Sequence, residues 1–149
     1  GAAGATIELP LEEACAADGL IFVHPNYWSR PPAMVCGWVD RVLRAGRAYH
    51  FVPDGQGGAK PVGLLKARVG MVFNTANTPQ EQEEALFGDP LEVHWRKVVF
   101  GLCGVRVTHR RAFGVVVTST EAQRRAWLEE TRGIVDRVFP GAGIGRESP

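Results

Sequence analysis

The residues best suited to chemistry fall in three loops, each next to an apolar run. The loop His24–Pro32 carries the adjacent aromatic residues Tyr27 and Trp28, and the loop Asn74–Pro79 is small and polar. The third loop, Thr118–Thr120, carries three hydroxyl groups. Aromatic rings stack on planar groups, and a polar loop that leads into a helix N-terminus offers free N–H groups to an anion or a carbonyl-rich ring. The first two loops together are suited to a planar, hydrogen-bonding heterocycle such as a flavin.

Each of these features also has a purely structural interpretation. Tyr27 and Trp28 would serve equally as hydrophobic cover for the end of a sheet, and Asn and Thr favour caps and turns for backbone reasons. His24, at the end of an apolar run, is expected to be hydrogen-bonded structurally rather than to be catalytic. The remaining tryptophans fall on expected helices among apolar neighbours and are interpreted as core residues; they are Trp38, Trp95 and Trp127.

Other kinds of active site find no support in the spacing of the reactive residues. The three cysteines and four histidines are scattered, so neither a disulfide framework nor a metal site is expected. We interpret the cysteines as small apolar residues in a reducing compartment. No Ser/His/Asp or Cys/His set is recognisable, and no paired carboxylates converge. The residues concerned are Cys15, Cys36, Cys103, His24, His50, His94 and His109.

The composition is that of one globular domain of 149 residues. Hydrophobic residues make up 45% and charged residues 22%, and a net charge of +1 gives no reason to expect nucleic-acid binding. No apolar run approaches the roughly 20 residues that a membrane span needs, and residues 1–4 do not resemble a secretory signal. We expect a single cytoplasmic domain, 1–149, with flexible ends at 1–9 and 140–149.

Three apolar runs are predicted to be the buried parallel strands that position the loops. They lie at residues 19–24, 67–73 and 111–117, and the middle run is predicted to lie between the other two. Intervals of about 45 residues leave room for right-handed crossovers through helices. The sequence also allows a further short strand near Arg106 and Val107. The expected fold class is α/β, an open parallel sheet with helices on both faces.

Proline and capping-box signals predict five helices around this sheet. Their expected positions are Leu11–Ala17 opened by Pro10, Ala33–Arg44 opened by Pro32, a helix started by Thr78–Glu81, one from Asp89–Glu92 to about Leu102, and one from Thr118–Glu121 to about Val138. The segment Gln56–Pro61 is predicted to be a glycine-rich loop.

One long, ordered set of motifs resembles a known family. The segments that carry it are Pro25–Ala33, Gly37–Val42 and Gly46–Phe51, with further likeness to one bacterial branch in Asn74–Pro79, Phe87–Glu92 and Leu102–Val105. They are similar to the flavodoxin-like NAD(P)H dehydrogenase (quinone) family, which includes DT-diaphorase, the bacterial drug-activity modulators and the ancillary subunits of potassium-efflux systems. The similarity covers about Leu11 to Val138.

The resemblance implies a tightly bound FMN or FAD that is reduced by NAD(P)H and reoxidised by a quinone or similar acceptor. The residues that it places beside the flavin ring are Pro25, Asn26, Tyr27 and Trp28 on one loop and Asn74, Thr75, Ala76 and Asn77 on the other. No catalytic side chain is carried over. DT-diaphorase has a tyrosine and a histidine in the stretch that corresponds to Glu81–Phe87, which here holds neither.

Compared with the family, the sequence given is expected to lack the first strand, phosphate loop and helix. We therefore expect an N-terminally truncated flavodoxin-like sheet of about three core parallel strands. Three functional hypotheses remain at this point. The first is a flavin-dependent NAD(P)H:quinone oxidoreductase, completed by another chain or binding flavin in an altered way. The second is a flavin-free homologue that acts as an interaction or regulatory subunit or that uses the strand-end cleft for another ligand. The third is a fragment of a normal enzyme.

The first testable prediction concerns assembly: the protein should form a homodimer. The family works as homodimers, and the helices after Pro32 and Asp89 would form the dimer face. The expected edge strand 19–24 adds a second reason, because Ile21 and Val23 would otherwise expose apolar surface worth about 25 cal/mol per Å². Light scattering at micromolar concentration tests this, and a stable monomer would contradict it.

Overall fold

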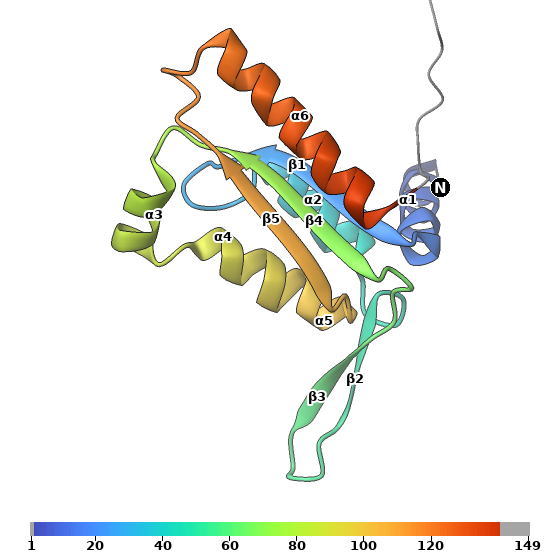
Figure 1. Ribbon diagram of the computed structural model, residues 1–149. Coiled ribbons are helices and arrows are strands. Elements are labelled where there is room, and N and C mark those ends of the chain that lie inside the picture. Colours follow the sequence, from blue (N-terminus) through green and yellow to red (C-terminus); the bar gives the residue numbers. More distant parts are fainter. Residues whose placement is uncertain (1, 141–149) are drawn as a thin grey trace, which may run out of the picture.

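The computed structural model describes residues 2–140, and their side chains from residue 8 on. Three strands, β1 (Gly19–Pro25), β4 (Val69–Thr75) and β5 (Val107–Phe113), form one parallel sheet in the order β1-β4-β5 (Figure 1). All three run in the same direction, and the middle apolar run pairs with both of the others. The predicted fold class, an open parallel sheet of three strands, is confirmed.

The three strands pair in register along their whole length. Gly19 lies beside Val69 and Pro25 beside Thr75, and β5 continues the same register with Phe113 beside Thr75. The carboxyl ends of the strands therefore meet at one edge of the sheet. The first two candidate loops follow β1 and β4, so both emerge at this edge of the sheet.

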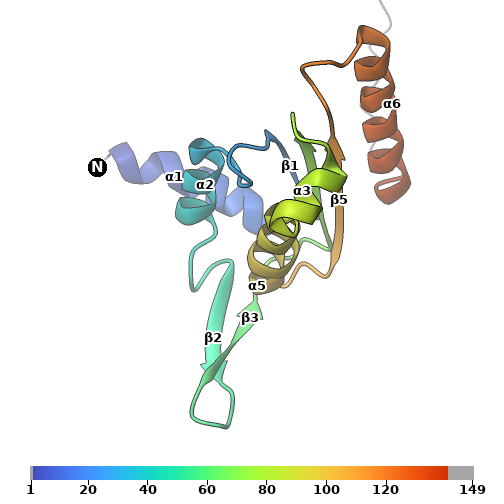
Figure 2. The same ribbon diagram turned by 90° about the vertical axis from the view of Figure 1, so that its left-hand side faces the viewer.

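Helices cover both faces of the sheet (Figure 2). On one face lies α6 (Glu121–Val138), which packs against Met71, Phe73 and Phe113. The helices of the opposite face bury the larger core cluster, in which Trp95 and Phe100 are almost completely enclosed. These helices are α1 (Ala2–Ala16), α2 (Ala33–Val42), and the continuous segment α4 (Pro90–Glu92), η1 (Val93–Phe100) and α5 (Gly101–Cys103). None of the helices described combines the length and the apolar character that crossing a bilayer requires.

Local signals located the helices after Pro32 and Asp89 correctly. The Asp89 carboxylate accepts a hydrogen bond from the Glu92 N–H at 3.2 Å, as an N-cap does, and the helical segment ends at Gly104 with φ of 83°. The middle of the segment, η1, is a π-helix, which the sequence did not predict. The other two capping boxes were wrong in detail. Helix α3 (Gln80–Phe87) has no side-chain cap, and α6 is capped by Thr120 with Gln123 instead of Thr118 with Glu121.

The first helix differs from the prediction of Leu11–Ala17. Helix α1 has Pro10 in its interior, and residues 2–9 are part of it. A proline inside a helix removes one hydrogen bond, but its φ near −65° is compatible with helical backbone. Leu11 and Ala14, buried in the core, hold this helix against the sheet. Of the other residues predicted to be flexible, Pro140 forms a turn after α6, and residues 1 and 141–149 lie outside the described residues.

The third strand is shifted from the predicted 111–117 to Val107–Phe113, so its start coincides with the short strand weighed at Arg106 and Val107. The apolar residues 115–117 belong to the connection after the sheet, where the Val116 N–H donates to the Ala76 carbonyl at 3.0 Å. In the described chain β5 pairs with β4 alone. Because an edge strand tolerates charged side chains, β5 does not coincide with the most apolar run, and the prediction from that run placed the strand too far along the chain.

The predicted loop Gln56–Pro61 is part of an antiparallel hairpin that projects from the body of the molecule (Figure 1). Its strands are β2 (Tyr49–Pro53) and β3 (Ala59–Gly63). The Asp54 carboxylate accepts hydrogen bonds from the N–H groups of Gln56 and Gly58 at 2.8 and 2.9 Å. These bonds close the turn and lower the pKa of Asp54. The glycines of the predicted loop Gln56–Pro61 instead belong to the turn of this hairpin.

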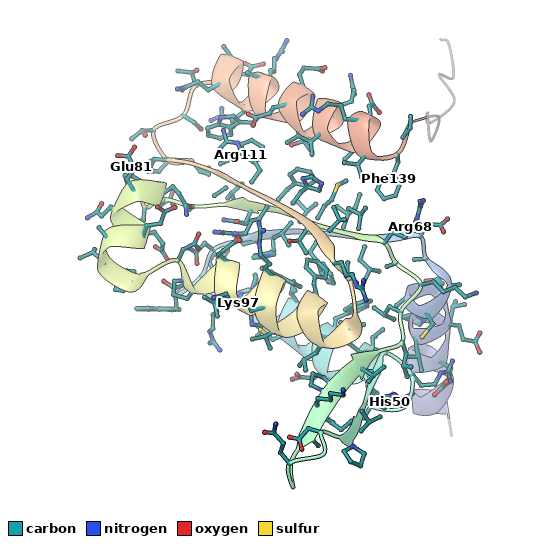
Figure 3. The ribbon with its side chains drawn as sticks, turned by 60° about the horizontal axis from the view of Figure 1, so that its bottom comes forward. His50, Arg68, Glu81, Lys97, Arg111 and Phe139 are labelled. Atoms are coloured by element: carbon teal, nitrogen blue, oxygen red, sulfur yellow. The ribbon has the colours of Figure 1, made fainter. Side chains whose placement is uncertain are left out.

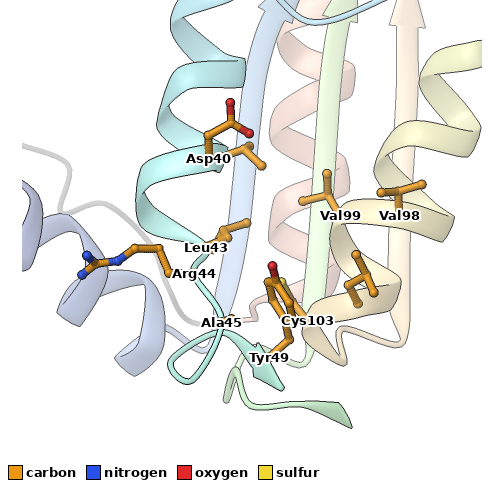
Figure 4. A pocket seen from close by; sticks show the side chains of 10 residues that line it. Asp40, Leu43, Arg44, Ala45, Tyr49, Val98, Val99 and Cys103 are labelled. Atoms are coloured by element: carbon orange, nitrogen blue, oxygen red, sulfur yellow. The ribbon is translucent and has the colours of Figure 1, made fainter. Parts of the chain in front are cut away.

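A hollow of about 310 Å³ lies between α2, the segment η1–α5 and the base of the hairpin (Figure 4). Its walls are mainly apolar, with Leu43, Val99 and Cys103 among them, and Asp40 and Tyr49 add polar groups. The two helices that border it are those that follow Pro32 and Asp89.

The close packing of β4 on η1 gives a stability prediction. A Cβ added at Gly70 would lie 2.6 Å from ring atoms of Phe100, which is 1% exposed. Gly70→Ala should therefore lower the free energy of unfolding by about 1–3 kcal/mol, measured by urea denaturation. The control is Gly37→Ala in α2, where nothing lies within 4 Å of the new Cβ. That variant should be neutral or up to about 1 kcal/mol more stable, and equal effects of the two variants would contradict the prediction.

Candidate functional site

A groove of about 630 Å³ lies at the carboxyl end of the sheet, between the loops that follow β1 and β4. The Asn26 N–H donates to the Thr75 carbonyl at 2.6 Å, which continues the pairing of the two strands into their loops. The groove is lined by Asn26, Tyr27, Trp28, Ser29, Ala76, Asn77, Thr78, Glu83, Phe87 and Pro90. The structure thus brings together the two loops that the sequence singled out, and it adds residues from α3.

The loop after β1 is a tight turn that displays Trp28. Tyr27 and Arg30 exchange two backbone hydrogen bonds of 3.1 Å, and Trp28 and Ser29 between them both have φ of 55°. Non-glycine residues rarely adopt positive φ, and each such residue costs about 1–3 kcal/mol. The Trp28 side chain is 93% exposed, so it provides little cover for the sheet end. A strained turn that holds a large aromatic ring in solvent beside a groove indicates a binding role.

The carboxylate of Glu83, on α3, closes the groove from the side. Glu83 is 6% exposed, and its Oε1 accepts hydrogen bonds from the Ser29 hydroxyl at 2.5 Å and from the Asn26 amide nitrogen at 3.2 Å. Sequence reasoning missed this residue. The family resemblance aligns Glu81–Phe87 with a stretch that holds a tyrosine and a histidine in DT-diaphorase, and it predicts no carboxylate contact from this stretch. The contact of Glu83 with Ser29 depends on how α3 packs.

The Asn26 amide has one unpaired atom. A carboxylate oxygen only accepts hydrogen bonds, so the NH₂ group of Asn26 must face Glu83. Its Oδ1 is then buried without a hydrogen-bond partner in the described structure. An unpaired buried acceptor is costly, and Asn26 lines the groove, so an N–H group of a ligand would satisfy it.

Three of the predicted site residues do not line the groove. Pro25 and Thr75 end β1 and β4 side by side and support the two loops from beneath. Asn74 is 1% exposed, and its Oδ1 accepts a hydrogen bond from Arg110 Nε at 3.0 Å. Arg110 also donates to Asp89, the cap of α4, at 2.5 Å. Asn74 therefore connects the sheet, through Arg110, to the helix beside the groove.

The third candidate loop and His24 have structural roles. The Thr120 hydroxyl caps α6, and the loop that contains it does not line the groove. His24 Nδ1 lies 2.8 Å from the Pro25 carbonyl, and the Trp95 indole N–H donates to His24 Nε2 at 3.0 Å. These two partners define a neutral ring protonated at Nδ1, so the expected structural role of His24 is confirmed. Burial lowers the pKa of both His24 and His94.

The predicted core tryptophans are also confirmed. Trp95 is 1% exposed, and Trp38 and Trp127 are half-buried and pack against the two core clusters.

The family model described as a flavodoxin-like fold matches residues 2–134. A ribosyldihydronicotinamide dehydrogenase (quinone) from Rattus norvegicus is 32% identical over 126 residues, which cover 79% of this chain and 52% of that protein. An FMN-dependent NADH:quinone oxidoreductase from Cupriavidus necator is 32% identical over 111 residues, 72% of this chain and 48% of that protein. The chain spans about half the length of these curated relatives.

Solved structures show the same fold. An NAD(P)H:quinone oxidoreductase from Methanothermobacter marburgensis superposes with a TM-score of 0.69 at 24% identity, over 91% of this chain and 64% of that one. An FMN-dependent NADH-azoreductase from Bacillus anthracis, in complex with FMN, gives a TM-score of 0.73 at 15% identity, over 92% and 63% of the two chains. At these identities the likeness establishes the fold alone.

His24, which is buried, and His94, which is partly buried, predict how stability depends on pH. Folding lowers the pKa of His24 and His94, so below the ordinary histidine pKa of about 6.5 the unfolded chain binds more protons than the folded one. The free energy of unfolding should be fully retained above pH 7. It should fall as the pH drops through about 6.5, by at most about 1.4 kcal/mol per pH unit for each histidine.

Urea unfolding between pH 5 and 8 measures this dependence. His24→Gln should reduce the slope, since glutamine does not titrate. The matched control is His50→Gln on the hairpin, where His50 is exposed and distant from the sheet (Figure 3). An unchanged slope in His24→Gln would show that another group is responsible.

Proposed function

Because the chain belongs to the flavodoxin-like fold family, we propose that its groove binds the ring of a flavin and that it functions in a flavin-dependent NAD(P)H:quinone oxidoreductase. One observation carries the proposal: an exposed tryptophan is held in a strained turn beside a groove at the carboxyl ends of parallel strands. Open α/β sheets bind their ligands at this edge, and neither the strain nor the exposure of Trp28 serves the core.

The groove fits the ring of a flavin in size and in chemistry. Its volume lies within the range of about 300–1,000 Å³ that is usual for small-molecule sites. Tyr27 and Trp28 offer aromatic faces to a planar ring, and the unpaired Asn26 Oδ1 offers an acceptor to a ring N–H. We propose that Asn26, Tyr27, Trp28, Ala76 and Asn77 contact the ring.

Pro25, Asn74 and Thr75 are proposed to hold the two loops in place. FMN is favoured over FAD, since the names of several relatives and of two solved structures specify FMN.

A bound flavin supplies hydride transfer from NAD(P)H to a quinone-type acceptor. The chain's residues provide binding and orientation. The aromatic side chains limit the ring to one plane, the loop after β4 closes its edge, and Glu83 keeps the opposite loop in position. The titratable groups that line the groove are Tyr27 and Glu83. No proton-transfer role is assigned to either.

Two proposals concern assembly and location. The homodimer predicted from the sequence is supported by the apolar hollow between α2 and η1–α5, since these helices are the expected dimer face (Figure 4). A cytoplasmic location is supported by the three cysteines, all of which are free thiols.

Trp28→Ala tests the flavin proposal. Loss of stacking should weaken binding of FMN and of lumiflavin, which is the flavin ring without its phosphate chain, by about 1–3 kcal/mol. Quenching of flavin fluorescence measures both affinities. Lumiflavin isolates the ring contacts, so the test does not depend on where the phosphate is bound.

The control for this test is Phe51→Ala on the hairpin. Phe51 is an exposed aromatic residue that does not line the groove, so its removal should leave both affinities unchanged. A wild-type protein that binds neither flavin, or an unchanged affinity in Trp28→Ala, would contradict the proposal.

A further inference from the structure

The turn that displays Trp28 cannot be held by its own two hydrogen bonds alone. Tyr27 and Arg30 close it through their backbones, but Trp28 and Ser29 both occupy the left-handed region that non-glycine residues disfavour. Strained backbone of this kind persists only where the surroundings over-determine it. A third contact must therefore keep the turn in place.

Glu83 provides that contact. Its Oε1 accepts a hydrogen bond from Ser29, the second of the two left-handed residues, and another from Asn26, which precedes the turn. One carboxylate oxygen thus contacts both the centre of the turn and the residue before it. Hydrogen bonds to a charged acceptor are stronger than neutral ones. The Glu83 residue is also almost fully buried, with an exposed fraction of 6%.

The burial of Glu83 has no other explanation among the described side chains. None of the ion pairs found between them includes Glu83. A favourable interaction with the N-terminus of α3 would not require burial, as Glu81 shows. Glu81 also lies in the first turn of α3, but it is exposed and points away from the body of the protein (Figure 3). A buried carboxylate without a cation is costly, and what it contacts here is the turn beside the groove.

We infer that Glu83 is the positioning residue of the groove: its carboxylate locks the turn Asn26–Arg30 and so sets the Trp28 ring in place for a planar ligand before the ligand binds. The ligand part of this inference rests on the proposed flavin function. Preorganisation improves affinity because the ordering of the turn is completed before binding. The lock also orients the Asn26 amide, whose free Oδ1 is directed away from Glu83.

The test combines hydrogen exchange with ligand affinity. Exchange of the Tyr27 and Arg30 amides reports on the two hydrogen bonds of the turn, and the amides of β4 serve as the internal reference for global stability. Lumiflavin is the ligand probe. The variants are Glu83→Ala, Glu83→Gln, Ser29→Ala and the matched control Glu81→Ala.

We expect Glu83→Ala to reduce protection of the Tyr27 and Arg30 amides, relative to β4, by on the order of tenfold or more, and to weaken lumiflavin binding similarly. Glu83→Gln retains an acceptor oxygen for both donors and should restore most of the protection and the affinity. Ser29→Ala removes one of the two donors and should give a smaller loss in the same direction. Glu81→Ala should change neither.

Protection of Tyr27 and Arg30 that is unchanged in Glu83→Ala would overturn the inference and leave the flavin proposal intact. If Glu83→Ala does not fold, unchanged protection in Ser29→Ala has the same meaning. Lost protection with unchanged lumiflavin affinity would also overturn the positioning role. A wild-type protein that does not bind lumiflavin would instead overturn the proposed function, and with it the ligand part of the inference.

Discussion

The pairing of β4 with a strand on each side is the constraint on which the rest of the structure depends. Residues 70–74 of this strand are all buried, and both of its edges are hydrogen-bonded. A strand in that position must be apolar on both faces and must have small residues where a helix approaches closely, as at Gly70 under Phe100. Because its neighbours run parallel and in step with it, the loops after β1 and β4 emerge side by side, and a groove forms between them.

A buried charge network connects this sheet to the helix beside the groove. The side chain of Arg110, 9% exposed on the edge strand β5, reaches Asn74 at the end of β4 and Asp89 at the start of α4. A guanidinium removed from water needs such partners to offset its desolvation. The same contacts satisfy the amide oxygen of Asn74 and hold the cap of α4. The polar residues at this corner thus serve to connect elements of the scaffold, and the groove is lined by residues further along each loop.

The groove itself is built from a conflict between local and tertiary preferences. The local backbone preference of Trp28 and Ser29 opposes the turn, and the carboxylate of Glu83 would by itself prefer water. The hydrogen bond between the Ser29 hydroxyl and the Glu83 carboxylate gives each group a partner. Such inconsistencies tend to mark functional sites. Here the inconsistency coincides with an exposed aromatic ring and with the edge of the sheet where related folds bind their ligands.

Sequence alone located β1 and β4, the parallel order of the three sheet strands and the two loops that meet, because β1 and β4 are each written as a continuous apolar run. It also located the helices after Pro32 and Asp89, where proline and an aspartate cap act on their own backbone. It misplaced β5, whose exposed edge relaxes the apolar requirement, and it interpreted the hairpin turn as a loop. Only the tertiary structure decided that Asn74 faces Arg110 and that Glu83 reaches Ser29 across 54 residues of chain. Such contacts depend on how separate elements pack, and no local preference of either partner records them.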